Sequence, residues 1–253
     1  MTGYVEWSEE PGRGRVVCCD RKIFDVRFRA AVIYRTEKTP EFLLRRRLAG
    51  AAKALRRCRV GAAVFPETFA YTQIFTRWGI FPVEVCPLLR ALAPELVQSA
   101  VKNRGLNMQT AIIAVCGERI TSELAWTATR LCQQSRYVLL AAPDPDGAFC
   151  RRIRREYGVA LVQTKDPGRI AGADICVQFS PECPPCPGGV VLPLYRGAVL
   201  PPIRLRLREG EERLVGVCNR MQVLAALYAD GAVLPEQIAA ETLPGVPEES
   251  GTA

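Results

Sequence analysis

The feature that most constrains the fold is an unbroken apolar run over residues 110–116, with the sequence TAIIAVC. A run without polar alternation is typical of a strand buried on both faces, and such strands belong to parallel sheets that helices cover. The expected strands of this stretch are residues 110–116, 136–142, 159–164 and 173–179, and the expected helices are residues 122–134 and 149–157. This alternation of strand and helix predicts an α/β fold with right-handed crossovers and a parallel sheet.

The turn after the first strand is the best candidate for a binding element. Gly117 follows the strand directly, and Thr121 and Ser122 are residue types that cap a helix N-terminus. In its order of strand, glycine turn and helix, the stretch from residue 108 to residue 181 resembles the Rossmann-like NAD(P)-binding domain superfamily. The fingerprint of that superfamily has three glycines, whereas this turn has Gly117 alone. The resemblance therefore implies a doubly wound parallel sheet with a degenerate glycine turn.

The resemblance also implies a nucleotide site at the carboxyl ends of the strands. The turn and the helix start would bind an anion through Gly117, Arg119, Thr121 and Ser122. Asp144, after the second strand, would contact a ribose, and Ser180, after the fourth strand, would line the nicotinamide side. Lys165 ends the third strand and is the candidate for proton transfer. NAD and NADP are the cofactors that the resemblance suggests, although the residues alone identify none.

Histidine is absent from all 253 residues, which excludes histidine-dependent triads and histidine metal ligands. Any general acid or base must be Asp, Glu, Lys, Tyr or Cys. Two functions stay open. One is a protein that binds a nucleotide or dinucleotide in a cleft between two α/β units, with an oxidoreductase as one form of it. The other is a non-catalytic interaction or regulatory protein on a degenerate Rossmann scaffold, which acts through a protein partner or as a homo-oligomer.

The pattern divides the chain into four parts. They are a smaller α/β unit over residues 1–105, the Rossmann-like unit over 106–200, a C-terminal hairpin with helices over 201–243, and a disordered tail over 244–253. In the first part we expect a frayed start over 1–14, strands over 15–20, 26–34, 60–65 and 80–85, and helices over 39–58, 68–78 and 87–104. Later we expect a strand over 190–194, a hairpin of 203–207 with 212–217, and helices over 219–230 and 235–240.

The net charge is +8, and the basic excess lies in residues 1–108, where arginines crowd the helix over 39–58. We interpret this face as solvated, because no interleaved aromatic residues and no nucleic-acid motif accompany it. Nucleic acid is therefore not an expected partner. No apolar run approaches the length that spans a bilayer, and the N-terminal region lacks the apolar core of a signal peptide. We expect a cytoplasmic protein without a membrane span.

The 11 cysteines have an odd count and scattered spacing, which does not predict a disulfide framework. Most of them lie in apolar or helical contexts, where cysteine acts as a small buried hydrophobic residue. Cys183 and Cys186 form a CPPC motif, which fits a redox pair, half of a zinc site or a plain loop. A redox pair needs a helix start, and the surrounding prolines oppose one. The adjacent Cys18 and Cys19 are poor as further zinc ligands. We therefore expect a proline-rich loop at the mouth of the candidate pocket and no metal site.

Overall fold

The computed structural model describes residues 1–9 and 16–243, so the predicted tail over 244–253 lies outside the described residues. The chain forms two compact units. Unit 1 consists of Met1–Leu88 and Leu207–Gln237, and unit 2 consists of Leu89–Arg206 and the described residues from Ile238 on. Each unit holds one five-stranded sheet, which confirms the predicted α/β class. The predicted division into four parts stays a prediction. The two compact units do not show which segments of the chain fold on their own.

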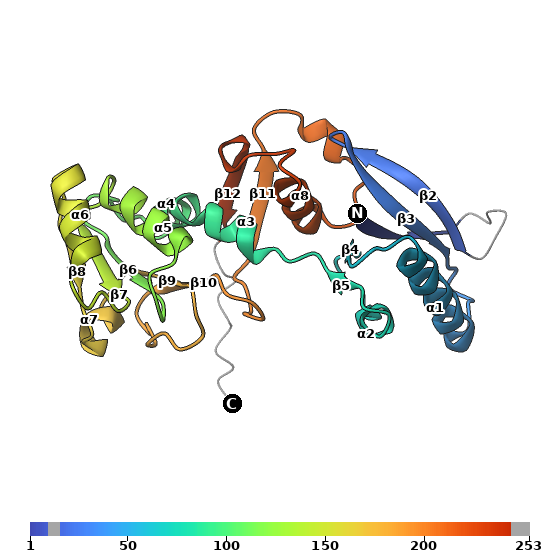
Figure 1. Ribbon diagram of the computed structural model, residues 1–253, viewed down its shortest axis with the longest axis horizontal. Coiled ribbons are helices and arrows are strands. Elements are labelled where there is room, and N and C mark those ends of the chain that lie inside the picture. The colour runs from blue at the N-terminus through green and yellow to red at the C-terminus, as the bar shows by residue number, and fades with distance from the viewer. Residues whose placement is uncertain (10–15, 244–253) are drawn as a thin grey trace. The chain divides into compact units, whose positions relative to one another are not determined.

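The sheet of unit 2, sheet B, is entirely parallel (Figure 1). Its strands are β6 Ile112–Cys116, β7 Tyr137–Ala141, β8 Leu161–Gln163, β9 Ile175–Gln178 and β10 Val190–Pro193. Their order in the sheet is β10-β9-β6-β7-β8. The chain therefore moves outward from β6 to β8, returns to the other side of β6, and continues from β9 to β10. This reversal is the doubly wound, Rossmann-like arrangement that the sequence predicted.

The two helices predicted within the Rossmann-like stretch form, one further short helix was not predicted, and the helix predicted over 87–104 is divided. The helices of unit 2 are α4 Ala93–Asn103, α5 Ser122–Cys132, α6 Ala148–Tyr157 and α7 Pro167–Ala171. The single helix predicted over 87–104 is wrong, because the chain forms α3 Cys86–Ala91 and then α4, with Leu92 between them. Pro94 explains the break, since a proline inside a helix clashes with the carbonyl group four residues earlier, here that of Arg90.

The sheet of unit 1, sheet A, is built around its first strand. The strands are β1 Thr2–Ser8, β2 Val16–Ile23, β3 Val26–Tyr34, β4 Ala62–Val64 and β5 Phe81–Pro82, in the order β2-β3-β1-β4-β5. β1 pairs in parallel with both β3 and β4, and Tyr4 and Val5 are fully buried. The predicted frayed start is therefore wrong for residues 2–8. Two neighbouring strands satisfy the backbone hydrogen-bonding groups of β1. The mixed composition of residues 2–8 does not indicate these partners, because they lie further along the chain.

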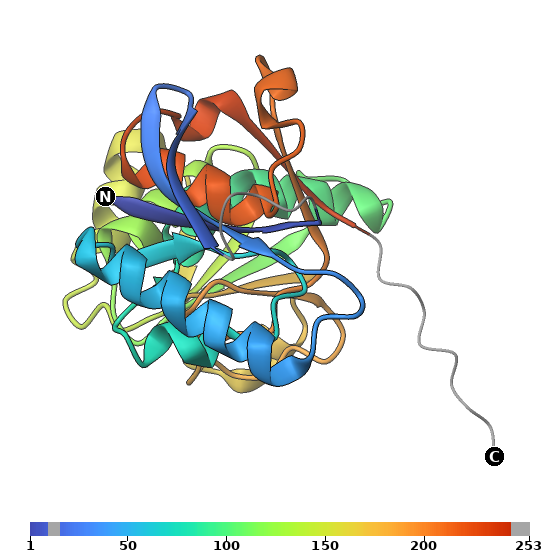
Figure 2. The ribbon, with the colours of Figure 1, turned by 90° about the vertical axis from the view of Figure 1, so that its right-hand side faces the viewer.

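Helix α1 Glu41–Arg57 supplies much of the core of unit 1, and Figure 2 shows it lying along sheet A. Its buried stripe, Leu44, Leu48, Ala51, Ala52 and Leu55, is the stripe that the sequence predicted. The predicted helix over 68–78 is shorter, as α2 Thr72–Thr76, and the predicted strand over 80–85 shrinks to β5. Helix α8 Arg220–Ala229 completes unit 1.

The C-terminal strands pair differently from the prediction. β11 Ile203–Leu207 pairs with β12 Ile238–Thr242. Residues 211–214 form the 3₁₀ helix η1 rather than a strand, and the helix predicted over 235–240 is only the short turn η2 Pro235–Gln237 before β12. In both strands buried and exposed residues alternate, so each offers one apolar face to the other elements.

No helix in the part of the chain that the structure describes has the length and apolar composition of a bilayer-spanning segment.

Candidate functional site

The loops that follow the strands of sheet B meet at one edge, because parallel strands all end on the same side. Gly117 follows β6, Asp144 lies beyond β7, Lys165 lies beyond β8, and Ser180 lies beyond β9. The strand order reverses between β6 and β9. In open α/β sheets a ligand crevice forms at such a switch point, outside the carboxyl ends of the strands. The topology therefore puts Gly117 and Ser180 on the two sides of the expected crevice.

The Gly117 turn is tight and closely packed. The backbone N–H of Gly117 donates to the Ala141 carbonyl oxygen over 3.1 Å, which ties the turn to β7. An ideal Cβ at Gly117 would lie 2.7 Å from Leu124 Cδ1 and 3.6 Å from Phe179 Cβ. Any larger residue here would force the Leu124 side chain to shift, so the glycine lets α5 pack closely against the turn.

The first turn of α5 lies directly beyond Gly117. Thr121 is its N-cap, and its Oγ1 accepts the backbone N–H of Leu124 over 3.2 Å. Ser122, the first helical residue, and Arg119 are both exposed. A helix N-terminus with its backbone N–H groups and a nearby guanidinium has the chemistry of an anion site. The four residues predicted to bind a phosphate lie within residues 117–122, and their role in anion binding stays a prediction.

Arg90, which the sequence did not single out, braces the same edge. Its Nε donates to the Leu194 carbonyl oxygen over 2.7 Å, and its Nη2 donates to the Phe179 carbonyl oxygen over 3.3 Å. Its Nη1 forms an ion pair with Glu123 over 3.0 Å. Arg90 therefore joins the ends of β9 and β10 to the start of α5. No local signal marks this residue, because all of its partners are far along the chain.

The carboxylate of Asp144 accepts hydrogen bonds from the first turn of the helix that follows it, α6. It accepts the backbone N–H of Cys150 over 3.1 Å and that of Phe149 over 3.4 Å. Burial raises the pKa of this carboxyl group, but these N–H donors outweigh burial and hold the pKa below its usual value. In this structure Asp144 therefore stabilises the start of α6, and the predicted ribose contact stays a prediction.

Lys165 and Ser180 are not brought together. β8 and β9 lie at opposite sides of β6 and β7 in the strand order, so the strands they follow are about 14 Å apart. Lys165 is exposed, and the Ser180 hydroxyl lies 3.4 Å from the Cys183 sulfur. The proton-transfer role of Lys165 stays a prediction, and its distance from the switch point does not favour it.

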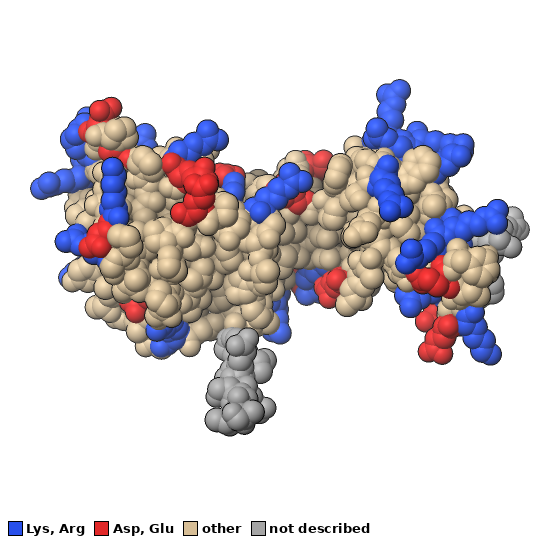
Figure 3. Space-filling view, turned by 90° about the horizontal axis from the view of Figure 1, so that it is seen from below, with Lys and Arg blue, Asp and Glu red and all other residues tan. Residues whose placement is uncertain are grey.

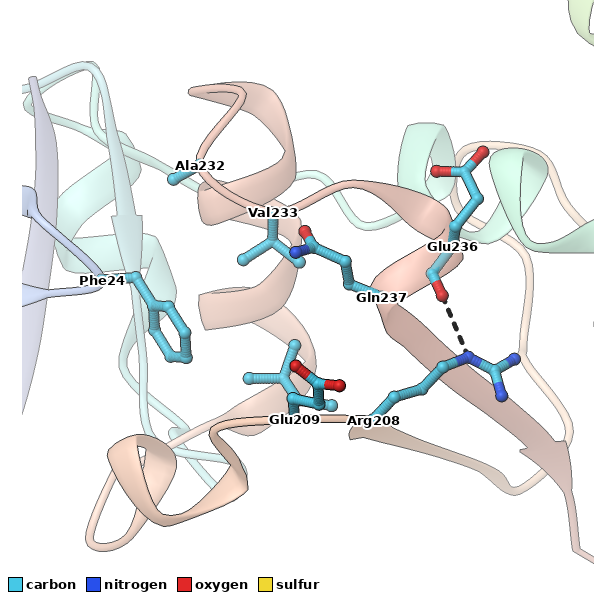
Figure 4. Close-up of a pocket in the computed structure, with 8 residues that line it drawn as sticks. Phe24, Arg208, Glu209, Ala232, Val233, Glu236 and Gln237 are labelled. Atoms are coloured by element: carbon cyan, nitrogen blue, oxygen red, sulfur yellow. Dashed lines mark hydrogen bonds between the residues drawn. The ribbon is translucent and has the colours of Figure 1, made fainter.

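The described residues also form two cavities that no residue of the predicted nucleotide site lines. One, of about 220 Å³, lies within unit 1 and is shown in Figure 4. Phe24, Val233 and Gln237 line it, and Arg208 Nε donates to the Glu236 carbonyl oxygen over 3.0 Å at its rim. The other, of about 370 Å³, lies among residues that precede β6, β7 and β8, which is the amino edge of sheet B. Neither cavity contains a residue of the predicted nucleotide site.

Two of the five arginines of α1 form hydrogen bonds within their own unit. Arg45 Nε donates to Glu41 Oε1 over 2.8 Å, and Arg47 Nη1 donates to the Tyr34 carbonyl oxygen over 2.6 Å. On the face of the molecule that Figure 3 shows, basic side chains are interspersed with acidic ones. These contacts support the interpretation of this helix face as a solvated surface.

No protein-family model matches the chain, and no curated protein matches it. Several solved structures are similar to it at a low level. L-tryptophan dehydrogenase from Nostoc punctiforme is 14% identical, with a TM-score of 0.32, over 66% of this chain and 51% of that chain. A dipicolinate synthase subunit from Bacillus halodurans is 15% identical, with a TM-score of 0.37, over 69% of this chain and 66% of that chain.

A shikimate dehydrogenase in complex with NADP+ is 11% identical, with a TM-score of 0.26, over 61% of this chain and 57% of that chain. The chain thus spans about half to two thirds of the length of these proteins. Likenesses of this size carry no argument about function. The Rossmann-like character of unit 2 therefore rests on its own strand order and glycine turn.

Proposed function

We propose that this chain binds a nucleotide or dinucleotide at the carboxyl edge of sheet B, between the ends of β6 and β9. The single observation that carries this proposal is the reversal of strand order at that point, with Gly117 and the N-terminus of α5 directly beyond it. A phosphate would accept hydrogen bonds from the first backbone N–H groups of α5 and from Ser122. Arg119 would supply the counter-charge.

NAD and NADP are the first ligands to test, because a nucleotide with two phosphates matches a turn and helix start of this kind. An oxidoreductase is the activity that this cofactor would support. Such an activity would take its acid or base from Lys, Asp, Glu, Tyr or Cys, since the chain has no histidine.

The decisive variant is Ser122→Asp. A carboxylate at the start of a helix favours the helix, because it faces the positive end of the macrodipole, but it repels a bound phosphate. We expect the variant to keep its thermal stability and to bind NAD or NADP at least about tenfold more weakly, which corresponds to roughly 1.4 kcal/mol. Isothermal titration calorimetry measures the affinity.

Phe42→Asp is the matched control, because Phe42 is 70% exposed in the first turn of α1, a helix of unit 1. It adds the same charge at a helix start and should leave the affinity unchanged. The proposal fails if the wild-type protein shows neither heat of binding nor a thermal shift with NAD, NADP, ATP or S-adenosylmethionine at millimolar concentration.

A second function is favoured by the same close packing. Leu124 and Phe179 cover Gly117, Arg90 is engaged by three partners, and the Asp144 carboxylate is taken by α6. A Rossmann scaffold closed in this way would serve as a non-catalytic interaction or regulatory protein, with a protein partner or a second copy as its ligand. Absence of nucleotide binding, together with a concentration-dependent mass in light scattering, would support this alternative.

We also propose a cytoplasmic location. All 11 cysteines are free thiols in the structure, and thiols are kept reduced in that compartment. Fractionation of cells that express the protein tests this directly.

A further inference from the structure

Four thiols gather at the end of sheet B, in one cluster with Ala114 and Ile170. Cys116 is the last residue of β6, Cys176 lies in β9, and the other two, Cys183 and Cys186, belong to the loop over residues 180–189. The sulfurs of Cys116 and Cys176 are 3.6 Å apart. Among the described residues, no group of three or more His, Cys, Asp or Glu side chains has the arrangement of a metal site. We therefore interpret the cluster through the reactivity of its thiols rather than as a metal site.

Cys183 is the member of the cluster best suited to react. It is half-buried, whereas the other three are buried. Its sulfur lies 3.4 Å from the Ser180 hydroxyl. The pKa of the Cys183 thiol is lowered most by hydrogen bonding from the Cys116 thiol, whereas burial raises it. Hydrogen-bond donors of Ser180 and Phe179 lower the pKa further, to about 6. A thiol in these surroundings is largely thiolate at neutral pH, and the thiolate is the reactive form.

Cys116 is the neighbour that Cys183 can pair with. Its own thiol keeps its proton, because the bonds to Cys176 and Cys183 and its burial raise its pKa. Cys116 has one proton to donate, and its sulfur is a hydrogen-bond neighbour of both Cys176 and Cys183, so it can stabilise a thiolate at either position. Cys183 lies in a loop without strand pairing, so its backbone can adjust to the geometry of a disulfide.

Two other pairings in the cluster, Cys116 with Cys176 and Cys183 with Cys186, are disfavoured by geometry. Cys116 is opposite Gln178 in the strand register, and Cys176 is opposite Ala114. This offset of two residues separates the two Cα atoms by about 8 Å, which exceeds the reach of a disulfide between fixed strands. Cys186 donates to the Ala173 carbonyl oxygen over 3.2 Å and packs against Gly189, so its sulfur faces the strand rather than Cys183.

We propose that Cys183 is a site of thiol–disulfide exchange with small-molecule disulfides, and that Cys116 is its resolving partner. The Cys183 thiolate attacks one sulfur of the small disulfide, whose S–S bond breaks, and a mixed disulfide forms while one small thiol leaves. Cys116 then gives up its proton and attacks the Cys183 sulfur, which displaces the second small thiol. Two protein thiols are oxidised to one disulfide, the small disulfide is reduced to two thiols, and the two protons end on those thiols.

The test uses the reduced, full-length protein and oxidised glutathione at pH 7, followed by peptide mapping under non-reducing conditions. The wild-type protein should yield a peptide pair joined through Cys116 and Cys183. Cys116→Ser should stop at a glutathione adduct on Cys183, because the resolving thiol is gone. Cys183→Ser should give neither product, and Cys186→Ser should still form the disulfide.

Cys19 provides an internal control, since it is exposed and belongs to unit 1 rather than to the cluster. Cys183 should react about tenfold faster than Cys19 although it is less exposed, because a larger share of it is thiolate. The inference is overturned if Cys19 reacts first, if the disulfide maps to Cys183 and Cys186, or if the purified protein holds a metal ion that protects all four thiols. None of these outcomes depends on nucleotide binding.

Discussion

At the scale of single residues, the turn after β6 depends on the absence of a side chain at Gly117. An added Cβ would approach Leu124 Cδ1 to 2.7 Å, and Leu124 is fully buried in α5, so it cannot turn into solvent. We predict that Gly117→Ala lowers the free energy of unfolding by about 1–3 kcal/mol, the usual cost of overpacking a core. Urea denaturation followed by circular dichroism measures this change.

Gly50→Ala is the control for this residue. Nothing lies within 4 Å of an ideal Cβ at Gly50, which sits inside α1, so alanine should stabilise the protein by roughly 0.5–1 kcal/mol. Adding Leu124→Ala to the Gly117→Ala variant should make the two losses less than additive, because the contact that causes the strain is removed. Equal losses from the two glycine variants would contradict the packing explanation.

At the scale of elements, the start of α6 depends on a charged cap. The pKa of Asp144 is lowered in the folded state, so its carboxylate stabilises the fold above the unfolded value near pH 4. This contribution is lost as the pH falls through the lower, folded value. We predict that Asp144→Asn is less stable than wild type at pH 7 and that the difference shrinks below about pH 4. Asp146→Asn, two residues on and exposed, removes a carboxylate that does not cap α6 and should leave the thermal unfolding temperature at pH 7 near that of wild type.

The elements also show which parts of the fold are encoded locally. Strands β6 to β10 and helices α5 and α6 were predictable because they carry their own apolar pattern and their own stops, such as the left-handed Gly158 after α6. β1 was not predictable. Its apolar residues, Tyr4, Val5 and Trp7, follow no clear period, and the strand is held by β3 on one side and β4 on the other. β12 was missed for the same reason, since its partner β11 lies more than thirty residues earlier.

At the scale of the whole molecule, the loops that meet at the carboxyl edge of sheet B were predictable, whereas the side-chain contacts at that edge were not. Parallel strands that alternate with helices bring their following loops to one edge, so the positions of Gly117 and Ser180 follow from the order of elements. Arg90 and the cluster of four thiols depend on contacts between residues far apart in the chain. A sequence pattern does not reveal contacts between residues far apart in the chain. The CPPC motif alone therefore did not indicate that Cys116 lies near Cys183.

Both units include residues from the C-terminal part of the chain, and this leads to a final prediction. The C-terminal segment serves both units: within unit 1, Gln222 of α8 accepts the Phe65 N–H over 2.8 Å, and within unit 2, Thr242 of β12 donates its N–H to Ser99 Oγ over 3.0 Å. A chain that ends at Arg206 should therefore lose protection from hydrogen exchange in β1 and in α4 together. Mass spectrometry of peptides from both elements measures this.

Single variants separate the two effects. Gln222→Ala leaves the Phe65 N–H without its acceptor, at a cost of about 1–3 kcal/mol, and should raise exchange in unit 1 only. Ser99→Ala removes the acceptor of the Thr242 N–H and should raise exchange in unit 2 only. If the shortened chain lost protection in one unit alone, residues 207–243 would be an appendage of that unit. Loss in both would mean that neither unit is complete until the end of the chain has been added.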